Sequence, residues 1–213
     1  MGTIERRERE KEQRKNDIID AAEKVIFSKG LETATMDEIA EVAELSKGTL
    51  YLYFKNKEDL YLAIHARGTR ILRQMFEKAA HKHEQGLDKA LSIGYAYLEF
   101  SHRYADYYNA MIYYESHAVE LTDEDSFAHA CLQEGEAALQ VLAEAIAGGI
   151  ADNSIRSDVD PFKTALILWG QSMGTLQLQS LKGDALGEKL NIDFEELVHL
   201  SFDMMRRSLQ NNP

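Results

Sequence analysis

Apolar residues recur at three- and four-residue spacing along most of the chain, the pattern of helices that each bury one face. Between residues 16 and 29 the apolar positions are Ile18, Ile19, Ala22, Val25 and Ile26. Gly30 follows and is expected to end this helix. Thr35 and Glu38 then have the spacing of a capping box, in which a hydroxyl and a carboxylate each accept from an exposed backbone N–H at a helix start. The pattern predicts a short second helix, Met36 to Ala43.

A third short helix is predicted after Ser46, which is a favourable N-cap residue. Its buried side chains would be Leu50 and Phe54, which are four residues apart. Asn56 is expected to cap a fourth, longer helix. Three short helices with Glu44, Leu45 and Ser46 as a tight turn predict a helix-turn-helix unit.

Beyond Gln85 the apolar spacing predicts longer helices. Their expected ranges are Leu87 to His102, Ala105 to His117, Asp123 to Ala147, Pro161 to Leu181 and Phe194 to Leu209. Pro161 suits the first turn of a helix, and Gly148-Gly149 is expected to stop one. The prediction is an all-α protein with an N-terminal three-helix helix-turn-helix domain and a C-terminal helical bundle for ligand binding and dimerisation. The expected division is a charged arm at 1–15, a DNA-binding domain at 16–62 and a ligand-binding and dimerisation domain at 63–213.

Composition agrees with the helical pattern. The 213 residues include only two prolines, and 45% are hydrophobic, enough for a sizeable core. The chain has a single cysteine, Cys131, which excludes an internal disulfide and favours a reducing compartment. We expect Cys131 to be a small buried side chain. The densely charged start does not resemble a signal peptide. The long uncharged run Thr164 to Leu181 carries three glutamines, so a core helix is favoured over a membrane span and a cytoplasmic protein is expected.

The net charge of -12 argues against a protein that binds nucleic acid over its whole surface. The first 65 residues hold eleven basic and fourteen acidic side chains, so most of the acidic excess falls in the remainder. A DNA-binding end would have to concentrate its cations locally.

The helix after Ser46 has an unusual outer surface. With Leu50 and Phe54 turned inward, the remaining circumference carries Lys47, Gly48, Thr49, Tyr51, Leu52 and Tyr53. A solvated helix normally carries Glu, Lys and Gln instead. A DNA major groove offers phosphate oxygens to Lys and Tyr, base edges to Thr and thymine methyl groups to Leu. This surface therefore predicts a DNA contact.

The stretch Thr35 to Leu60, TMDEIAEVAELSKGTLYLYFKNKEDL, resembles the DNA-binding signature of the TetR family of transcriptional regulators. The preceding helix is similar as well, and GIADNSIRSDVDP, Gly149 to Pro161, resembles the linker before the dimerisation helices of many members. The resemblance implies that Thr35 caps a helix against a phosphate, that Lys57 contacts phosphate, and that the third helix binds DNA through Lys47, Gly48, Thr49, Tyr51 and Tyr53. Glu44 departs from the family, which usually has Gly in the turn. A positive φ at that position would cost on the order of 1 kcal/mol for a residue other than glycine.

Several of these positions have a second interpretation. Tyr51 and Tyr53 are also consistent with a role in covering the junction to the fourth helix, and Lys57 with a solvated helix start. The basic residues of the arm are Arg6, Arg7, Arg9, Arg14 and Lys15. Flexible basic arms reach the minor groove, but the interleaved glutamates are equally consistent with a solvated extension of the first helix.

The last two helices are the candidates for dimerisation. The resemblance implies a four-helix interface between two subunits, for which packing within one chain is the alternative. The expected interface residues are Phe162, Ala165, Trp169, Gly170, Met173, Gly174, Leu197, Val198, Phe202 and Met205. A two-fold dimer would place two recognition helices at half-sites about one DNA turn (~34–36 Å) apart.

Seven of the ten tyrosines fall between Tyr95 and Tyr114, which suggests an effector pocket of apolar rings with polar tips. The candidate lining residues are Tyr97, Phe100, Tyr104, Tyr107, Tyr108, Met111, Tyr114 and Trp169. For any single one of these, core packing is the alternative. Histidine and acid pairs two residues apart point away from each other on a helix, so no metal site is expected, and no cofactor.

The sequence therefore predicts a homodimeric regulator, most simply a repressor, that binds a palindromic operator and is released by a small, largely apolar effector. A DNA-bound structural factor without an effector is an alternative. A helical enzyme is disfavoured because the chain has no glycine-rich phosphate loop, nucleophile motif or metal-ligand spacing.

Overall fold

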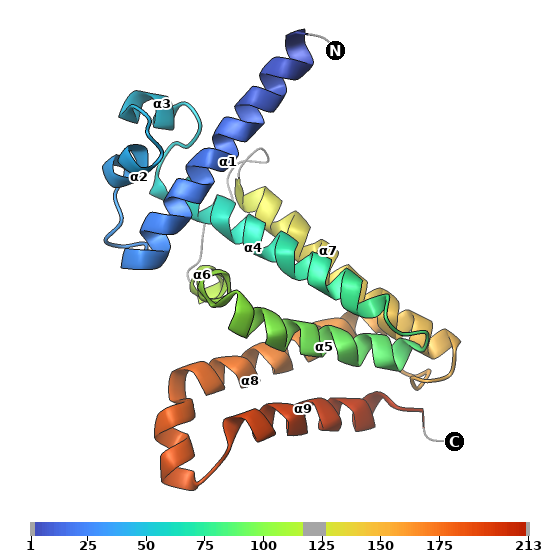
Figure 1. The fold of residues 1–213 in the computed structure, drawn as a ribbon. Helices are drawn as coiled ribbons and strands as arrows, with labels where there is room; N and C mark the ends of the chain where they lie inside the picture. The colour runs from blue at the N-terminus through green and yellow to red at the C-terminus, as the bar shows by residue number, and fades with distance from the viewer. Residues whose placement is uncertain (1–2, 117–126, 212–213) are drawn as a thin grey trace. The chain divides into compact units, whose positions relative to one another are not determined.

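The structure is a computed structural model that describes residues 3–116 and 127–211, and it is built from helices (Figure 1). They are α1 Thr3–Lys29, α2 Met36–Val42, α3 Lys47–Tyr51, α4 Lys57–Ala80, α5 Gly86–Arg103, α6 Ala105–Ser116, α7 Phe127–Ala151, α8 Pro161–Leu190 and α9 Phe194–Leu209. The all-α class is confirmed. The described ranges contain one isolated β-bridge, between Ile155 and Gln210, and no helix that is long and apolar enough to cross a membrane.

The chain forms two compact units. Unit 1 comprises Met1–Gly68 and Asp106–Leu132, and unit 2 comprises Thr69–Ala105 and Gln133–Pro213. Helices α4 and α7 contribute residues to both units. The units are therefore divided differently from the predicted domains, which follow the order of the chain. The predicted arm is not a separate element, because α1 begins at Thr3 and continues without a break to Lys29.

The core of unit 1 forms around the apolar face of α1. Ile18 and Ala22 of α1 are fully buried, as are Leu50 and Ile64. Contacts with α6 and α7 extend this core: the Tyr61 hydroxyl donates to the Ala110 carbonyl over 2.7 Å, and the rings of Phe54 and Phe127 stack with centroids 5.1 Å apart. Helix α6 and the start of α7 therefore share one core with the helix-turn-helix.

A polar network around Arg67 joins α1, α4 and α6 within unit 1. The Arg67 guanidinium donates to Asp20, to Glu23 over 2.9 Å and to Asn16 over 3.1 Å. The Tyr107 hydroxyl donates to the same Glu23 carboxylate over 2.7 Å. Burial, together with the bond to Glu23, raises the pKa of Tyr107, so its hydroxyl stays protonated as a donor. The sequence singled out Tyr107 only as a candidate pocket residue. It did not indicate the other four side chains, because none of them forms a local motif with another.

In unit 2 the start of α5 crosses α7 where both helices have glycine. A Cβ at Gly86 would lie 2.0 Å from the Gly149 nitrogen, and a Cβ at Gly149 would lie 2.6 Å from the Ile155 side chain. Gln85 makes no side-chain cap for α5. Instead, the Asp152 carboxylate accepts from the Gly86 N–H over 2.7 Å and the Ser154 hydroxyl from the Leu87 N–H over 3.0 Å. Side chains distant in sequence thus cap this helix.

This crossing overturns the predicted stop at Gly148-Gly149, because α7 continues through both residues to Ala151. Gly149 allows α5 and Ile155 to pack closely against α7 and does not end the helix. Helix α8 is also longer than predicted, ending at Leu190 rather than Leu181, where Asn191 takes a left-handed conformation with φ 52°. Its predicted start at Pro161 and the predicted range of α9 are confirmed. The predicted ends at His117 and Asp123 lie outside the described residues.

Gly149→Ala should lower the free energy of unfolding by about 1–3 kcal/mol, because the added methyl group overlaps the fully buried Ile155 side chain. The matched control is the adjacent Gly148→Ala, whose methyl group meets no atom within 4 Å and should stabilise the helix by about 0.5–1 kcal/mol. Chemical denaturation measures both values. Equal effects of the two substitutions would contradict the crossing described for α5 and α7.

Candidate nucleic-acid interface

The start of α2 is capped as the sequence predicts. The Thr35 hydroxyl accepts from the Glu38 N–H over 3.3 Å, and the Glu38 carboxylate accepts from the Thr35 N–H over 3.2 Å. Lys29 at the end of α1 pairs with Glu38 and, as the largest cause, lowers the pKa of that carboxyl. The capping box thus also connects α2 to α1, and Thr35 itself stays exposed.

The turn between α2 and α3 is a Schellman motif. The Glu44 N–H donates to the Glu41 carbonyl over 3.1 Å, and the Leu45 N–H donates to the Ala40 carbonyl over 2.9 Å. Glu44 takes a φ of 56°, the left-handed region that favours glycine. The strain expected at this position from the sequence is therefore present in the structure.

Helix α3 is short and fixed from two sides. The Ser46 hydroxyl accepts from the Thr49 N–H over 3.1 Å and lies 2.8 Å from the Thr49 hydroxyl. Leu50 and Phe54 are 0% and 1% exposed and anchor the helix on the core of unit 1. The opposite side is open: Tyr51 is 45% exposed and Leu52 is 81% exposed.

The remaining predicted DNA-contact residues near this open side differ in exposure and in their side-chain partners. Gly48 is exposed, and a Cβ there would approach only the Ser46 hydroxyl, at 3.9 Å. The Lys47 ammonium pairs with Asp37 of α2, and the Lys57 ammonium donates to the Glu32 carbonyl over 3.1 Å. Tyr53 is half-buried and packs against the core, which agrees with the alternative interpretation of that residue.

The start of α4 completes the surface. The Asn56 side chain accepts from the Asp59 N–H over 2.8 Å, which confirms the predicted cap, and the Asp59 carboxylate accepts from the Lys55 N–H over 2.9 Å. The second bond was not predicted, although the spacing of Asn56 and Asp59 is the signal that would have indicated it. The capped starts of α2, α3 and α4 are connected through Lys47, which pairs with Asp37, and Lys57, which donates to the Glu32 carbonyl.

Residues 18–64 match the family model described as bacterial regulatory proteins, tetR family. This segment of the chain, which holds the helix-turn-helix, thus matches the TetR family. The Bacillus subtilis regulator YhgD is 40% identical over 74 residues, which are 35% of this chain and 37% of that protein. The fatty acid metabolism regulator protein of the same species is 47% identical over 47 residues, 22% of this chain and 24% of that protein. The chain thus matches about a third or less of the length of these curated relatives.

Solved structures extend the likeness from the DNA-binding segment to the TetR fold as a whole. Bacillus subtilis FadR, solved in complex with stearoyl-CoA, has a TM-score of 0.70 at 19% identity and covers 90% of this chain and 97% of its own. A Rhodococcus protein of unknown function reaches a TM-score of 0.74 at 19% identity, covering 92% of this chain and 95% of its own. At this level of identity the likeness establishes a shared fold.

The predicted effector-pocket residues are divided between the two units of this TetR fold. Unit 1 holds Tyr107, Tyr108, Met111 and Tyr114, and unit 2 holds Tyr97, Phe100, Tyr104 and Trp169. Several of them are buried in side-chain contacts, such as Phe100, which is 0% exposed and stacks on Tyr104 with centroids 5.6 Å apart. A single effector pocket lined by all of these residues stays a prediction.

His65 and Cys131 are both buried in unit 1, where they pack against other side chains. His65 of α4 is buried against the Tyr114 ring, and burial lowers its pKa to about 4. The Cys131 thiol donates to the Leu62 carbonyl over 3.1 Å, and burial raises its pKa to about 12, which makes it a poor nucleophile. No group of three metal-ligating side chains occurs in the part of the chain that the structure describes. His117 lies outside that part.

The predicted dimer residues separate into buried and open positions. Ala165, Val198, Phe202 and Met205 are buried within unit 2 and so offer little surface to a second chain. The expected interface stays a prediction. The open face of α8 is a row at four-residue spacing: Phe162, Leu166, Gly170, Gly174 and Leu178. Leu200 and Met204 are the corresponding exposed residues of α9, whereas Trp169, Met173 and Leu197 are half-buried.

Glu44→Gly should raise the free energy of unfolding by about 1 kcal/mol, because glycine adopts the left-handed conformation without steric cost. The matched control, Glu41→Gly within α2, should lower it by about as much. Urea denaturation compares the two variants with the parent. Destabilisation by Glu44→Gly would show that the turn is not strained as described.

Proposed function

We propose that this chain is a transcription regulator that binds operator DNA through the exposed side of α3. The observation that carries the proposal is a five-residue helix that is capped at Ser46, anchored by Leu50 and Phe54, and left open at Tyr51 and Leu52. Adjacent exposed apolar and aromatic side chains on a short, firmly anchored helix are typical of a surface that binds a partner. The major groove is wide enough to admit a helix and displays both base edges and methyl groups.

The chemistry of each residue on this side of α3 fits one part of the duplex. Leu52 offers an apolar contact to a thymine methyl group, and Tyr51 a hydroxyl to a phosphate or base. Thr49 is half-buried and would offer base edges a hydroxyl that lies 2.8 Å from the Ser46 hydroxyl. The absent side chain of Gly48 permits close approach of the backbone, with Thr35 at the neighbouring helix start. Lys47 can exchange Asp37 for a phosphate, because solvent-exposed ion pairs contribute little to stability. Lys57 would exchange its hydrogen bond to the Glu32 carbonyl for a charge-assisted one to a phosphate.

A homodimer is the second part of the proposal. The open row on α8 contains two glycines, and a Cβ at Gly170 or Gly174 would meet no atom within 4 Å. Another helix backbone can therefore approach closely between Leu166 and Leu178, which are 43% and 41% exposed. Two copies joined through α8 and α9 would present two α3 helices to the half-sites of a palindrome.

The third part is release by a small, largely apolar effector bound by the C-terminal helices, so that the protein acts as a repressor. The named relatives include a fatty acid metabolism regulator, and the structural neighbours include complexes with stearoyl-CoA and triclosan. Long acyl thioesters are therefore the first ligands to test. Effector and operator binding would be coupled equilibria, each weakening the other by the same factor.

Thr49→Ala and Tyr51→Ala should each weaken binding to a duplex selected from a random pool by about tenfold or more, since a base contact contributes about 1–3 kcal/mol. Tyr95→Ala in unit 2 is the matched control, because Tyr95 and Tyr51 are both 45% exposed. Fluorescence anisotropy measures the affinities. Parental affinity in both α3 variants would refute the assignment of this helix.

Leu166→Glu should convert the dimer to a monomer, because it places a charge in the centre of the apolar row. Leu132→Glu is matched to it, since both leucines are 43% exposed and only Leu166 lies on α8. Sedimentation equilibrium gives the mass of each variant. A parent chain that is monomeric, or a Leu166→Glu variant that remains dimeric, would contradict the proposed interface.

A further inference from the structure

The N-terminal half of α1 extends beyond the packed core as a solvent-exposed helix. Residues 4–14 are exposed along this stretch. Farther along the same helix, Ile18, Ala21 and Val25 are 0%, 3% and 6% exposed and face the core of unit 1. That core also holds Leu50 of α3, and α1 packs directly against α2. This face of α1 is therefore the one turned toward the helix-turn-helix.

Cations continue the buried face toward the N-terminus. Arg7, Lys11 and Arg14 precede Ile18, Ala21 and Val25 in one series whose spacing alternates between four and three residues. Residues with this spacing share one face of a helix. The apolar stripe that packs on the helix-turn-helix thus becomes a basic stripe where α1 leaves the core.

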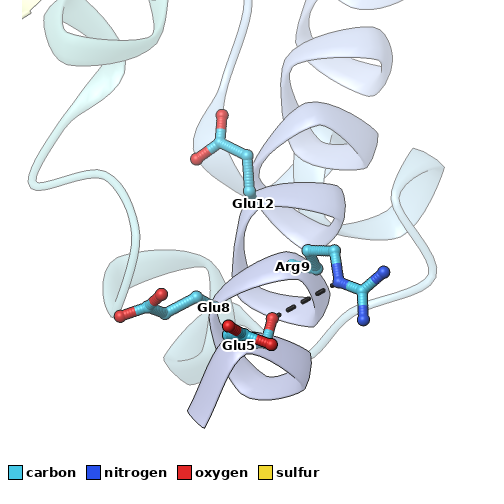
Figure 2. A pocket seen from close by; sticks show the side chains of 4 residues that line it. All are labelled: Glu5, Glu8, Arg9 and Glu12. Atoms are coloured by element: carbon cyan, nitrogen blue, oxygen red, sulfur yellow. Dashed lines mark hydrogen bonds between the residues drawn. The ribbon is translucent and has the colours of Figure 1, made fainter. Parts of the chain in front are cut away.

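Three of the acidic side chains gather on another face. Glu5, Glu8 and Glu12, spaced by three and four residues, line a shallow surface hollow together with Arg9 (Figure 2). The Arg9 side chain donates to the Glu5 carbonyl over 3.4 Å, and Arg6 pairs with Glu10 over 3.4 Å. Among the described residues, the side chains of Arg7, Lys11 and Arg14 have no acidic partner. The three cations of the stripe therefore lie apart from the acidic side chains of the hollow, whereas Arg6 and Arg9 lie among acidic side chains.

Lys15, which directly follows the stripe residue Arg14, connects this end of the stripe to the core below α3. The Lys15 ammonium lies 4.7 Å from the centroid of the Phe127 ring, which in turn stacks on Phe54. The Phe54 N–H donates to the Leu50 carbonyl in the turn that closes α3. Figure 1 shows the N-terminal half of α1 and α3 toward the same end of unit 1.

We propose that Arg7, Lys11 and Arg14 bind the phosphates of the DNA that flanks the segment contacted by α3. This inference rests on the proposed function. The three cations span about 10 Å along the helix axis, which corresponds to about three phosphate steps of one strand. A helix about 10 Å wide does not enter a minor groove about 6 Å wide, so the contact is with the backbone rather than with base edges.

The test uses the full chain and a duplex recovered from a random pool by the parent protein, with and without about one helical turn (~10 base pairs) of flanking DNA on each side. Arg7→Gln with Arg14→Gln should weaken binding to the long duplex about tenfold. It should also reduce the salt dependence of log K by about two per bound subunit. The matched control, Arg6→Gln with Arg9→Gln, removes the same charge from the same helix and should keep parental affinity. Circular dichroism checks that both variants melt as the parent does.

Each remaining result decides against the inference. Equal losses in the two double variants would indicate general charge attraction, and parental affinity in both would show that the stripe does not contact DNA. An affinity of the parent that is independent of flanking DNA would overturn it as well. If the parent recovers no duplex at all, the proposed function fails and this inference fails with it. Recovery of a duplex whose binding depends on Thr49 but not on Arg7 and Arg14 would leave the proposed function intact and reject only the stripe.

Discussion

The burial of Leu50 and Phe54 in the core of unit 1 is the contact on which the rest of the interface depends. A helix of five residues does not form by itself in water, because nucleation costs more than so few hydrogen bonds return. Two fully buried side chains, one hydroxyl cap and a Schellman turn supply the missing stability. They also fix the rotation of α3, so that the exposed residues face one direction.

The same core is shared by elements that the sequence separates. Through Arg67 and Glu23, α1 is held to α4 and α6 by charge-assisted hydrogen bonds, which are stronger than neutral ones. Glu23 accepts from both Arg67 and Tyr107, so displacement of either donor would leave a largely buried carboxylate with fewer partners. A displacement of α6 would thereby act on α1, the helix that carries both the apolar stripe under α3 and the basic stripe beyond it.

Much of the helix-turn-helix could be predicted from the sequence because its signals are local. Thr35, Ser46 and Asn56 cap helices within three residues, and the spacing of Leu50 and Phe54 defines the buried face without reference to distant residues. Even the positive φ of Glu44 follows from its place in the turn.

The features that depend on distant partners could not be predicted in this way. Gly149 resembles a helix stop in the sequence, but its role is set by Gly86 and Ile155. An amphipathic helix such as α9 shows which residues are apolar but not whether their neighbour is the same chain, so Phe202 was assigned to an interface although it is buried within unit 2. The tyrosine-rich segment is continuous in sequence, yet the boundary between the units falls within it, at Ala105 and Asp106.

The most direct test of the central claim is methylation protection of guanine N7, which lies in the major groove, on a duplex selected by the parent chain. We expect two protected clusters related by two-fold symmetry, with centres about one DNA turn (~34–36 Å) apart. Protection that is absent from the major groove, or confined to a single cluster without a symmetric partner, would contradict it.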